Sequence, residues 1–375
     1  MVTRLATSLV NQGLDCIIAT LDYREHGPQI VADNVQVMSI PAGTVTRWLR
    51  GWSPAFRRRL AAMASENVSV VHSHGLWMLP NLYARQAAIG SHVPLVISPH
   101  GMLEEWSFGH NRLRKKMAWN LYERANLKAA ALFHATSEAE AASIRVLGRR
   151  QPIAIISNGV DLPDLATIPA RSQLEKRFPE LAGKQWLLFL SRIHPKKGVA
   201  ELLRVWGKLA ASYPDWQLVI AGQDLDDYSK TIMRQAAVLE LTNRVTFTGM
   251  LIGEDKVCAM GNAGLFVLPT HSENFGLVVA EALAHGVPVV TTTAAPWRNL
   301  IDNRCGWWIE PGEAELLATL THAMGLSAEE RRAMGSRGRD MVERNYAWTR
   351  VAAEMKSAYA WLCKVGPRPG CVETD

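Results

Sequence analysis

Paired cysteines are missing from this sequence of 375 residues. Its five cysteines, Cys16, Cys258, Cys305, Cys363 and Cys371, are scattered singly, and none belongs to a C-x-x-C pair. An odd and dispersed set argues against a disulfide framework and against a structural zinc site. We therefore expect a reducing compartment, the cytoplasm.

Long hydrophobic runs are missing as well. No apolar stretch approaches the roughly 18 residues that span a bilayer, and residues 1–10 lack the charged and then apolar pattern of a signal peptide. The sequence thus predicts a soluble protein, attached at most to the surface of a membrane.

Two glycine-rich nucleotide motifs are also absent. No G-x-G-x-x-G follows a strand and opens a helix, so a dinucleotide site has no support. No G-x-x-x-x-G-K-[ST] is present either, which excludes a P-loop kinase or ATPase.

What is present suits a globular protein of two domains, or three small ones. Apolar residues make up 48% of the chain and charged residues 20%, which is enough for ordinary hydrophobic cores. Most of the formal net charge of +6 falls within residues 1–165. This half is expected to meet an anion, such as nucleic acid, phospholipid or a diphosphate.

Short runs rich in Val, Ile and Leu alternate with helix-period segments along the whole chain. Such runs, without polar alternation, are typical of a parallel sheet covered by helices, built from βα units. The predicted strands are residues 15–21, 68–72, 94–98, 131–135, 153–157, 186–191, 217–221, 244–248, 263–269, 287–291 and 307–309. The clearest predicted helices are residues 199–212, 231–240 and 277–285.

The series of strands is interrupted near residues 160–185, where Pro163, Pro169 and Pro179 lie. We predict one α/β domain over 1–165 and a second over 166–347, both doubly wound and facing a cleft. A helix over 348–363 is expected to cross back to the first domain, followed by a frayed tail over 364–375. Ligands of such sheets bind at the carboxyl ends of the strands.

The first informative motif, S-R-I-H-P-K-K-G, follows a predicted strand and precedes a helix. Arg192 can bind phosphate oxygens in a bidentate manner, and Lys197 supplies a point charge. Gly198 lets the backbone approach closely. A diphosphate site and a solvated basic loop are equally good interpretations of this motif alone.

The second motif, E-N-F-G-L-V-V-A-E, spans another strand–loop–helix junction. Backbone N–H groups from Phe275 to Leu277 are expected to open the helix and donate hydrogen bonds to a phosphate oxygen. Glu273 suits the hydroxyls of a sugar, and Glu281 those of a ribose. Glu281 facing solvent or pairing with a lysine is the alternative, which the apolar surroundings disfavour.

Together, S-R-x-H-P-K-K-G and E-x-F-G-x-x-x-x-E resemble the motifs of retaining glycosyltransferase family 4, the glycosyl transferases of group 1, which have the GT-B fold. The resemblance covers residues 1–363. It implies a nucleoside-diphosphate sugar as donor and a saccharide or lipid-linked acceptor. It assigns the donor diphosphate to Arg192, Lys197, Gly276 and Leu277, the donor sugar to Glu273, Asn274 and Phe275, the ribose to Glu281, and the vicinity of the nucleobase to Thr248, Gly249 and Met250.

Two histidine segments follow predicted strands in the first half, His72-Ser73-His74 and Pro99-His100-Gly101. A lone histidine at a strand end is more often structural than functional. The resemblance implies that His100 faces the donor sugar, with His74 as the second choice for contact with the reaction centre. Residues 157–161 resemble the loop at the domain junction.

The chemistry that the resemblance implies is transfer with retention of configuration, in which the leaving diphosphate helps to deprotonate the acceptor. No carboxylate of the first half is placed as a nucleophile, in contrast to the paired carboxylates of glycoside hydrolases. Asp224 and Asp226 form a D-x-D motif, which binds metal in other glycosyltransferases, but its position resembles a surface loop. We expect neither a metal nor another cofactor.

Arginines and aromatic residues alternate between Arg47 and Arg59, and more cations lie between Arg112 and Lys116 near Trp106. Cations interleaved with tryptophan suit the interface of an anionic membrane, so we predict peripheral attachment to the inner face of the cell membrane. A solvated helix face is the alternative. No nucleic-acid module is recognisable, and we expect no nucleic-acid partner.

The start of the chain departs from the family. Residues 1–13 resemble the first helix, so the opening strand and its glycine-rich loop are expected to be missing. A late start codon or a fragment of a once-active enzyme would explain this. We favour sugar transfer in the assembly of cell-surface polysaccharide or lipopolysaccharide. The alternatives are a nucleotide-sugar 2-epimerase and an inactive nucleotide-sugar-binding protein.

Overall fold

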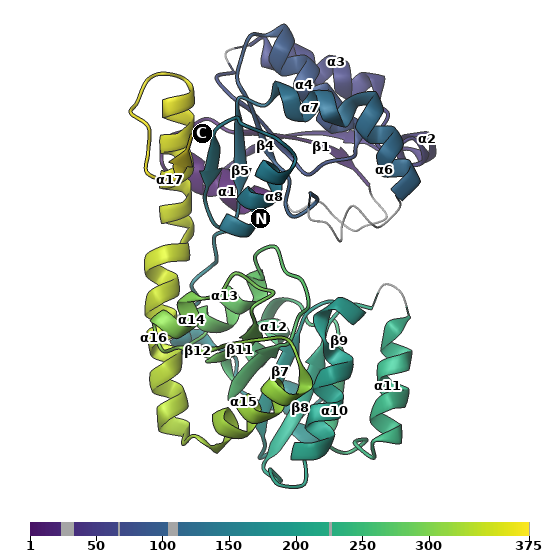
Figure 1. Cartoon of the computed structure of the whole chain (residues 1–375), viewed down its shortest axis with the longest axis vertical. Helices are drawn as coiled ribbons and strands as arrows, with labels where there is room; N and C mark the ends of the chain where they lie inside the picture. Colours follow the sequence, from purple (N-terminus) through teal and green to yellow (C-terminus); the bar gives the residue numbers. More distant parts are fainter. Residues whose placement is uncertain (24–33, 67, 104–111, 225–226, 375) are drawn as a thin grey trace. The chain divides into compact units, whose positions relative to one another are not determined.

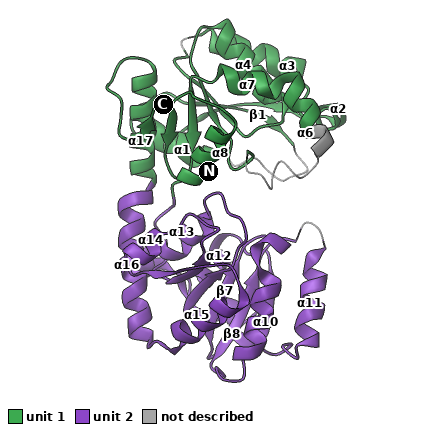
Figure 2. Ribbon diagram, in the orientation of Figure 1, with its two compact units in different colours: residues 1–159, 348–375 green, residues 160–347 purple. Residues whose placement is uncertain are grey.

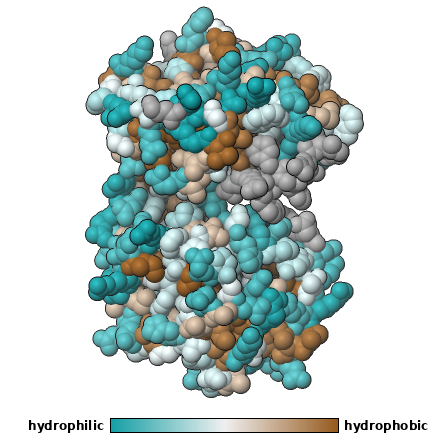
Figure 3. Space-filling view, viewed as in Figure 1, coloured by the Kyte–Doolittle hydropathy of each residue, from teal (hydrophilic) through white to brown (hydrophobic). Residues whose placement is uncertain are grey.

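The computed structural model describes residues 1–23, 34–66, 68–103, 112–224 and 227–374. The chain divides into two compact units (Figures 1 and 2). Unit 1 consists of residues 1–159 and 348–375, and unit 2 consists of residues 160–347. No helix among the described residues is long and apolar enough to cross a membrane. The face seen in Figure 3 is mostly hydrophilic, with its hydrophobic residues in small separate groups.

Unit 2 contains a parallel sheet of six strands in the order β12-β11-β10-β7-β8-β9. Counted within the unit from β9, this is the order 3-2-1-4-5-6 of Rossmann folds, and the strand order reverses between β7 and β10. The strands are β7 (Gln185–Leu190), β8 (Trp216–Ala221), β9 (Val245–Gly249), β10 (Leu265–Leu268), β11 (Val289–Thr292) and β12 (Gly306–Ile309).

Helices cover both faces of the unit 2 sheet, so its central strands are buried almost completely, as continuous apolar runs require. These helices are α9 (Ser172–Glu175), α10 (Val199–Leu209), α11 (Tyr228–Val238), α12 (Gly253–Gly261), α13 (Leu277–Ala284), α14 (Asn299–Asp302), α15 (Glu313–Gly325) and α16 (Ala328–Tyr346).

Unit 1 contains a sheet of five strands in the order β13-β6-β5-β4-β3 and a separate parallel pair, β1-β2. No strand among the described residues joins β1 to β3, so the strands of this unit lie in two pieces. The strands are β1 (Ile17–Asp22), β2 (Gln36–Pro41), β3 (Val71–His74), β4 (Leu95–Ser98), β5 (Leu132–Ala135), β6 (Ile153–Ile155) and β13 (Val372–Glu373).

Helices α1 and α17 pack together on one face of the five-stranded sheet, where Leu5, Leu9 and Met355 share a core with Val96 and Leu132. Residues from opposite ends of the chain therefore build one hydrophobic layer. The helices of unit 1 are α1 (Val2–Val10), α2 (Thr44–Trp48), α3 (Pro54–Ala64), α4 (Leu79–Gly90), α6 (Arg112–Ala118), α7 (Arg124–Ala129), α8 (Glu138–Val146) and α17 (Trp348–Leu362).

The prediction of two doubly wound α/β units is confirmed, but two details of it are wrong. Strand β2 is not among the predicted strands, because it is half-exposed and lacks the continuous apolar run of a buried parallel strand. The tail is not frayed throughout. Val372 is 4% exposed and β13 pairs antiparallel with β6, although two residues are too short to produce a sequence pattern.

Candidate functional site

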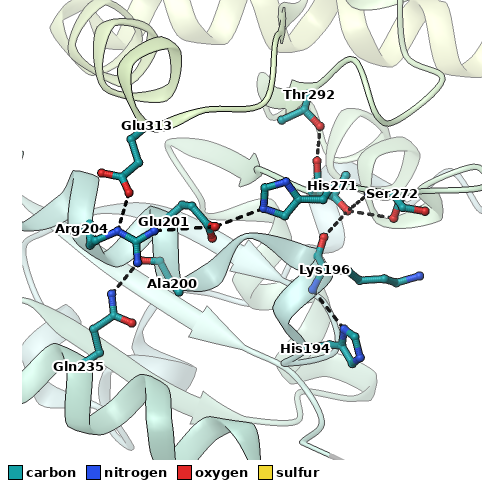
Figure 4. Close-up of polar contacts among 11 residues, drawn as sticks. His194, Lys196, Ala200, Glu201, Arg204, Gln235, His271, Ser272, Thr292 and Glu313 are labelled. Carbon is teal, nitrogen blue, oxygen red and sulfur yellow. Dashed lines mark hydrogen bonds and ion pairs between the residues drawn. The ribbon is translucent and has the colours of Figure 1, made fainter. Parts of the chain in front are cut away.

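Both sequence motifs of unit 2 lie at the point where the strand order reverses. The first follows β7 and the second follows β10, and these strands are neighbours in the sheet. The carbonyl of Lys196 accepts a hydrogen bond from the His271 N–H at 2.7 Å, as Figure 4 shows, and another from the Thr270 hydroxyl at 3.1 Å. The two loops are therefore fastened to each other at the position where Rossmann folds bind ligands.

Gly198 makes this close approach possible. Its φ of +71° is left-handed, and a Cβ atom at this position would overlap the carbonyl oxygen of Pro269. Any other residue would push the two loops apart and would also be strained. The glycine therefore fixes the distance between the motifs, and helix α10 begins directly after it.

Lys197 and Glu273 form an ion pair with each other. Their side chains are only 6% and 10% exposed, so the pair is buried between the two loops. A buried pair tolerates the loss of one partner poorly, because the remaining charge stays uncompensated. From the sequence, Lys197 is assigned to a diphosphate and Glu273 to a sugar. No feature of the sequence indicates that the two residues pair with each other.

Arg192 stands in contrast to Lys197. It follows β7 and is exposed, and no carboxylate within the described residues pairs with it. Its guanidinium group can thus bind an anion without first breaking an ion pair.

Helix α13 points its N-terminus at the same region. It begins at Leu277 after Gly276, whose φ is +76°. A Cβ at Gly276 would lie 3.2 Å from the Trp297 Nε1 and 3.3 Å from the Glu273 Cγ. The first N–H groups of a helix lack acceptors within it, and the helix dipole favours an anion there.

The side chain of Phe275 is buried, which leaves only its backbone for contact with a ligand. The ring is 5% exposed and packs against Trp297 and Tyr346, with ring centroids 5.3 and 5.7 Å apart. The indole N–H of Trp297 donates to the Phe275 carbonyl at 2.6 Å. Half-buried Asn274 lies in the same turn between Glu273 and Phe275. A sugar contact from Phe275, as the sequence predicts, can therefore involve only its backbone.

Glu281 is paired with a lysine, the alternative that the apolar surroundings disfavoured. Its Oε1 accepts a hydrogen bond from Lys256 at 2.7 Å. Its Oε2 is buried and has no hydrogen-bond partner in the described parts of the chain. One carboxylate oxygen thus serves the ion pair, while the other remains available to a hydroxyl.

Thr248, Gly249 and Met250 lie at the end of the edge strand β9 and directly beyond it. Gly249 accepts a hydrogen bond from the Gly222 N–H at 2.9 Å, and Met250 is 60% exposed. Strand β8 separates them from the loop after β7. Like the two motifs, they lie at the carboxyl ends of the strands, but on the β9 side of the sheet.

A chain of polar contacts supports the second motif from outside (Figure 4). The His271 Nε2 lies 3.3 Å from Glu201 Oε1 on α10, and Arg204 of α10 donates to Glu313 of α15 at 2.5 Å. The first contact holds the loop between β10 and α13 against α10, and the second joins α10 to α15. Sequence reasoning missed them, because the residues come from three separate segments.

In unit 1, His74 and His100 lie side by side at the ends of β3 and β4. His74 Nδ1 and His100 Nε2 are 3.0 Å apart, and the rings stack at 5.3 Å. Burial, followed by the charge of His134, lowers the pKa of His100 to about 4, although Glu140 acts in the opposite direction. At neutral pH both rings are neutral and can share one proton donor and one acceptor.

A second hydrogen-bonded chain runs behind this pair. His72 contacts the Tyr359 hydroxyl and the Ser98 hydroxyl at 2.6 Å each, and Ser98 contacts His134 at 2.7 Å. Burial is the main cause that lowers the pKa of His72 and of His134. The carboxyl end of this sheet is therefore a layer of neutral imidazoles.

Glu140 positions the loop that carries His100. Its Oε1 accepts from the Gly101 N–H at 2.6 Å and its Oε2 accepts from the Thr136 N–H at 2.8 Å. His100 itself has a left-handed φ of +53°. The buried carboxylate thus orients the imidazole without touching it.

Within the described ranges, no group of three His, Cys, Asp or Glu residues is placed to hold a metal ion. Asp224 of the D-x-D motif instead caps α11, accepting from the N–H groups of Tyr228 and Ser229 at 3.0 Å each. Asp226 lies outside the described residues.

The basic segment between Arg47 and Arg59 exposes some of its aromatic residues and buries another. Trp48 is 82% exposed and Trp52 is 45% exposed, whereas Phe56 is 2% exposed and packs against Tyr83. Only two of the three aromatic residues can therefore meet a membrane.

The second basic segment, between Trp106 and Lys116, lies partly outside the described residues. Trp106 and the side chains of Arg112 and Arg114 are not among the described residues. The ammonium of Lys115 lies 5.6 Å from the centre of the Trp77 ring.

Comparison with known families places both halves of the chain among sugar-transferring enzymes. Residues 171–341 match the family described as glycosyl transferases group 1. Residues 1–159 match the glycosyl transferase 4-like domain.

Two curated relatives illustrate the likeness. A GDP-mannose-dependent monoacylated alpha-(1-6)-phosphatidylinositol monomannoside mannosyltransferase of Corynebacterium glutamicum is 30% identical over 165 residues, 42% of each chain. The phosphatidyl-myo-inositol mannosyltransferase of Mycolicibacterium smegmatis is 29% identical over 214 residues, 56% of this chain and 52% of the relative. The chain spans about half the length of these curated relatives.

Solved structures share the fold over nearly the whole chain. The crystal structure of Anabaena Alr3699/HepE in complex with UDP and glucose has a TM-score of 0.74 and 19% identity, over 96% of this chain and 95% of the other. At this identity the likeness establishes the fold.

Proposed function

Because the chain belongs to the group 1 glycosyltransferases of the GT-B fold, we propose that it transfers a sugar from a nucleoside-diphosphate sugar to a saccharide or lipid-linked acceptor. The observation that carries this proposal lies in unit 2. Two loops meet at the reversal of the strand order, and the Lys197–Glu273 pair that joins them lies next to Gly276, where α13 begins.

The donor diphosphate is held by Arg192, Lys197 and the backbone N–H groups of Gly276 and Leu277. Their combined positive charge stabilises the charge that develops on the leaving diphosphate. Since these groups supply that charge, the transfer proceeds without a metal ion or another cofactor.

The remaining donor contacts of the proposal are those that the family resemblance implies. Glu281 accepts a ribose hydroxyl at its buried Oε2, while its Oε1 stays on Lys256. Glu273, with Asn274 and the backbone of Phe275, holds the hydroxyls of the donor sugar. The nucleobase lies along the segment from Thr248 to Met250.

His100 contacts the sugar during transfer, with His74 fixing the orientation of its ring. A neutral imidazole can donate to or accept from a hydroxyl without attracting the diphosphate. Transfer proceeds with retention of configuration, the leaving diphosphate taking the proton of the acceptor hydroxyl.

The acceptor is presented at a membrane surface. Exposed Trp48 and Trp52, beside the arginines of α2 and α3, suit the interface of an anionic leaflet. The relatives named above act on phosphatidylinositol-based lipids, which favours a lipid-linked acceptor in the assembly of a cell-surface glycan.

Binding measurements test this proposal. We expect thermal unfolding to shift with UDP or GDP and with the matching sugar nucleotide, UDP-glucose or GDP-mannose. Ligand at 100 times its dissociation constant stabilises a fold by about 2.7 kcal/mol. The shift should be lost in Glu281→Ala and Arg192→Ala, and retained in Lys208→Ala, which changes an exposed lysine of α10. No shift with any nucleotide would contradict the proposal.

The same preparation separates transfer from isomerisation. A transferase releases the nucleoside diphosphate only when an acceptor is supplied, and it leaves the donor sugar unchanged. Conversion of the donor into its epimer without an acceptor would instead identify a nucleotide-sugar isomerase.

A further inference from the structure

The ion pair of Lys197 and Glu273 joins two residues that are assigned to different parts of the donor. In the proposed function, on which this inference rests, Lys197 binds the diphosphate and Glu273 binds the sugar. The structure pairs them with each other. A diphosphate that approaches Lys197 must therefore compete with the Glu273 carboxylate for the same ammonium group.

Both partners are held by the surrounding backbone. Lys197 ends the 3-10 turn Pro195–Lys197 and precedes Gly198, which allows the contact with the second loop. The Glu273 N–H donates to the Ala294 carbonyl at 3.0 Å. Because the loops are fastened together, the two side chains cannot separate as freely as an exposed surface pair.

Burial makes the competition costly for an anion. With only 6% and 10% of the side chains exposed, water screens the Glu273 charge weakly. A free nucleoside diphosphate brings two or more negative charges next to this carboxylate and offers it nothing in exchange. A nucleoside-diphosphate sugar brings hydroxyl groups, which donate hydrogen bonds to the carboxylate once it leaves Lys197.

We propose that the Lys197–Glu273 pair makes the site selective for the intact sugar nucleotide over the nucleoside diphosphate left after transfer. Glu273 acts as a specificity residue that rejects the product, in addition to its contact with the donor sugar. The consequence is faster release of the nucleoside diphosphate and weaker product inhibition.

The second ion pair of the site provides a matched comparison. Glu281 also pairs with a lysine, Lys256, but at half-exposed positions, with 21% and 33% of the side chains accessible. Its proposed ligand, the ribose, is common to the sugar nucleotide and the nucleoside diphosphate. Changing Glu281 is therefore expected to weaken both ligands equally and to leave the selectivity unchanged.

Titration calorimetry of the full chain tests this proposal. Dissociation constants are measured for UDP with UDP-glucose, and for GDP with GDP-mannose, on the native protein, Glu273→Gln and Glu281→Gln. We expect Glu273→Gln to bind the nucleoside diphosphate about tenfold more tightly, because the nearby like charge is removed. Its preference for the sugar nucleotide should fall at least about tenfold, since the charged hydrogen bond is lost as well.

The proposal is overturned if Glu273→Gln binds the nucleoside diphosphate no more tightly than the native protein does. It is also overturned if Glu281→Gln changes the preference as much as Glu273→Gln. Failure of the native protein to bind any nucleotide would instead reject the proposed function itself.

A second pair of variants keeps the test valid if Glu273→Gln does not fold. Lys197→Met leaves Glu273 charged and unpaired beside the diphosphate, whereas Lys197→Met with Glu273→Gln removes both charges, which folded proteins often tolerate well. We expect the double variant to bind the nucleoside diphosphate at least about tenfold more tightly than Lys197→Met. Equal affinities would overturn the proposal.

Discussion

The carboxyl ends of the strands carry charged pairs in unit 2 and neutral imidazoles in unit 1. In unit 2, Lys197–Glu273 joins the loops after β7 and β10, and Lys256–Glu281 joins the helices α12 and α13. In unit 1, His72, His74 and His100 form hydrogen-bonded contacts at the corresponding ends of β3 and β4. Both sheets are parallel there, so the fold alone does not explain the difference.

The contrast matches the two kinds of ligand in the proposed reaction. A diphosphate needs positive charge, and an unused lysine needs a counter-ion when it is buried. A hydroxyl needs only a neutral donor or acceptor, and burial keeps these histidines neutral. The carboxyl ends of parallel strands can therefore suit either a charged or a neutral ligand, depending on the residues in the loops that follow the strands.

The largest effect is expected at the charged side chains that follow the strands of unit 2. Arg192→Ala should lower kcat/KM by about 100- to 1000-fold, because the developing charge on the diphosphate loses a donor. The rate is measured as release of the nucleoside diphosphate in the presence of an acceptor. Lys208→Ala, on the same unit, should leave the rate within a factor of two or so. Equal losses in both variants would mean that charge at the sheet edge has no special role.

Substitution of a histidine at the end of the unit 1 strands should lower the rate of transfer without changing the affinity for the donor. His100→Asn should lower kcat by about 100-fold, since a positioned imidazole typically contributes this much, and leave the dissociation constant of the nucleoside diphosphate unchanged. Asparagine suits the left-handed backbone of His100. His92→Asn is the control, because His92 is exposed and has a similar φ of +56°. Loss of nucleotide binding in His100→Asn would contradict the division of tasks.

Acid should destabilise unit 1 more than unit 2. The folded state lowers the pKa of His100 to about 4, and lowers those of His72, His74 and His134 as well. Below the ordinary pKa near 6.5 the unfolded chain binds protons that the folded chain does not. Stability is therefore complete above pH 6.5 and falls as the pH drops toward 4, by about 2 kcal/mol at pH 5 for His100 alone.

Hydrogen exchange at pH 7 and pH 5 measures this difference within one molecule. Amides of β3, β4 and β5 should lose protection at pH 5, after correction for the intrinsic exchange rate. Amides of β7 and β10 should change less, because the four histidines named above, whose pKa is lowered, all lie in unit 1. Earlier loss of protection in unit 2 would contradict the assignment.

The smallest effect is expected at the exposed tryptophans. Trp48→Ser with Trp52→Ser should weaken binding to vesicles that contain anionic lipid by several-fold, since each ring contributes buried apolar area. Val146→Ser, which changes an 86% exposed residue of α8, is the control. Sedimentation with the vesicles measures the affinity. Unchanged binding would favour a solvated basic face.

Much of the fold could be predicted, because parallel strands that are buried on both faces leave continuous apolar runs. The runs that become β7, β8 and β10 are of this kind. Strand β2 is half-exposed and β13 has only two residues, so neither produces such a run.

The residues of the candidate site could be predicted from the sequence, but the ion pairs between them could not. The spacing of Arg192, Glu273 and Glu281 within two strand–loop–helix junctions identified them as candidates. It did not reveal that Glu273 pairs with Lys197 or Glu281 with Lys256, because these partners are far apart in the sequence. Likewise, burial of the Phe275 ring depends on Trp297 and Tyr346, which no motif includes.

The charged side chains that follow β7 and β10 of unit 2 are proposed to bind the nucleoside diphosphate. Hydrogen exchange with saturating nucleoside diphosphate tests this claim most directly, using whichever of UDP and GDP binds. We predict protection of residues 192–198 and 273–281, with little change at residues 72–74 and 98–101. Protection confined to the histidine segments of unit 1, with none at the two motifs, would contradict the claim.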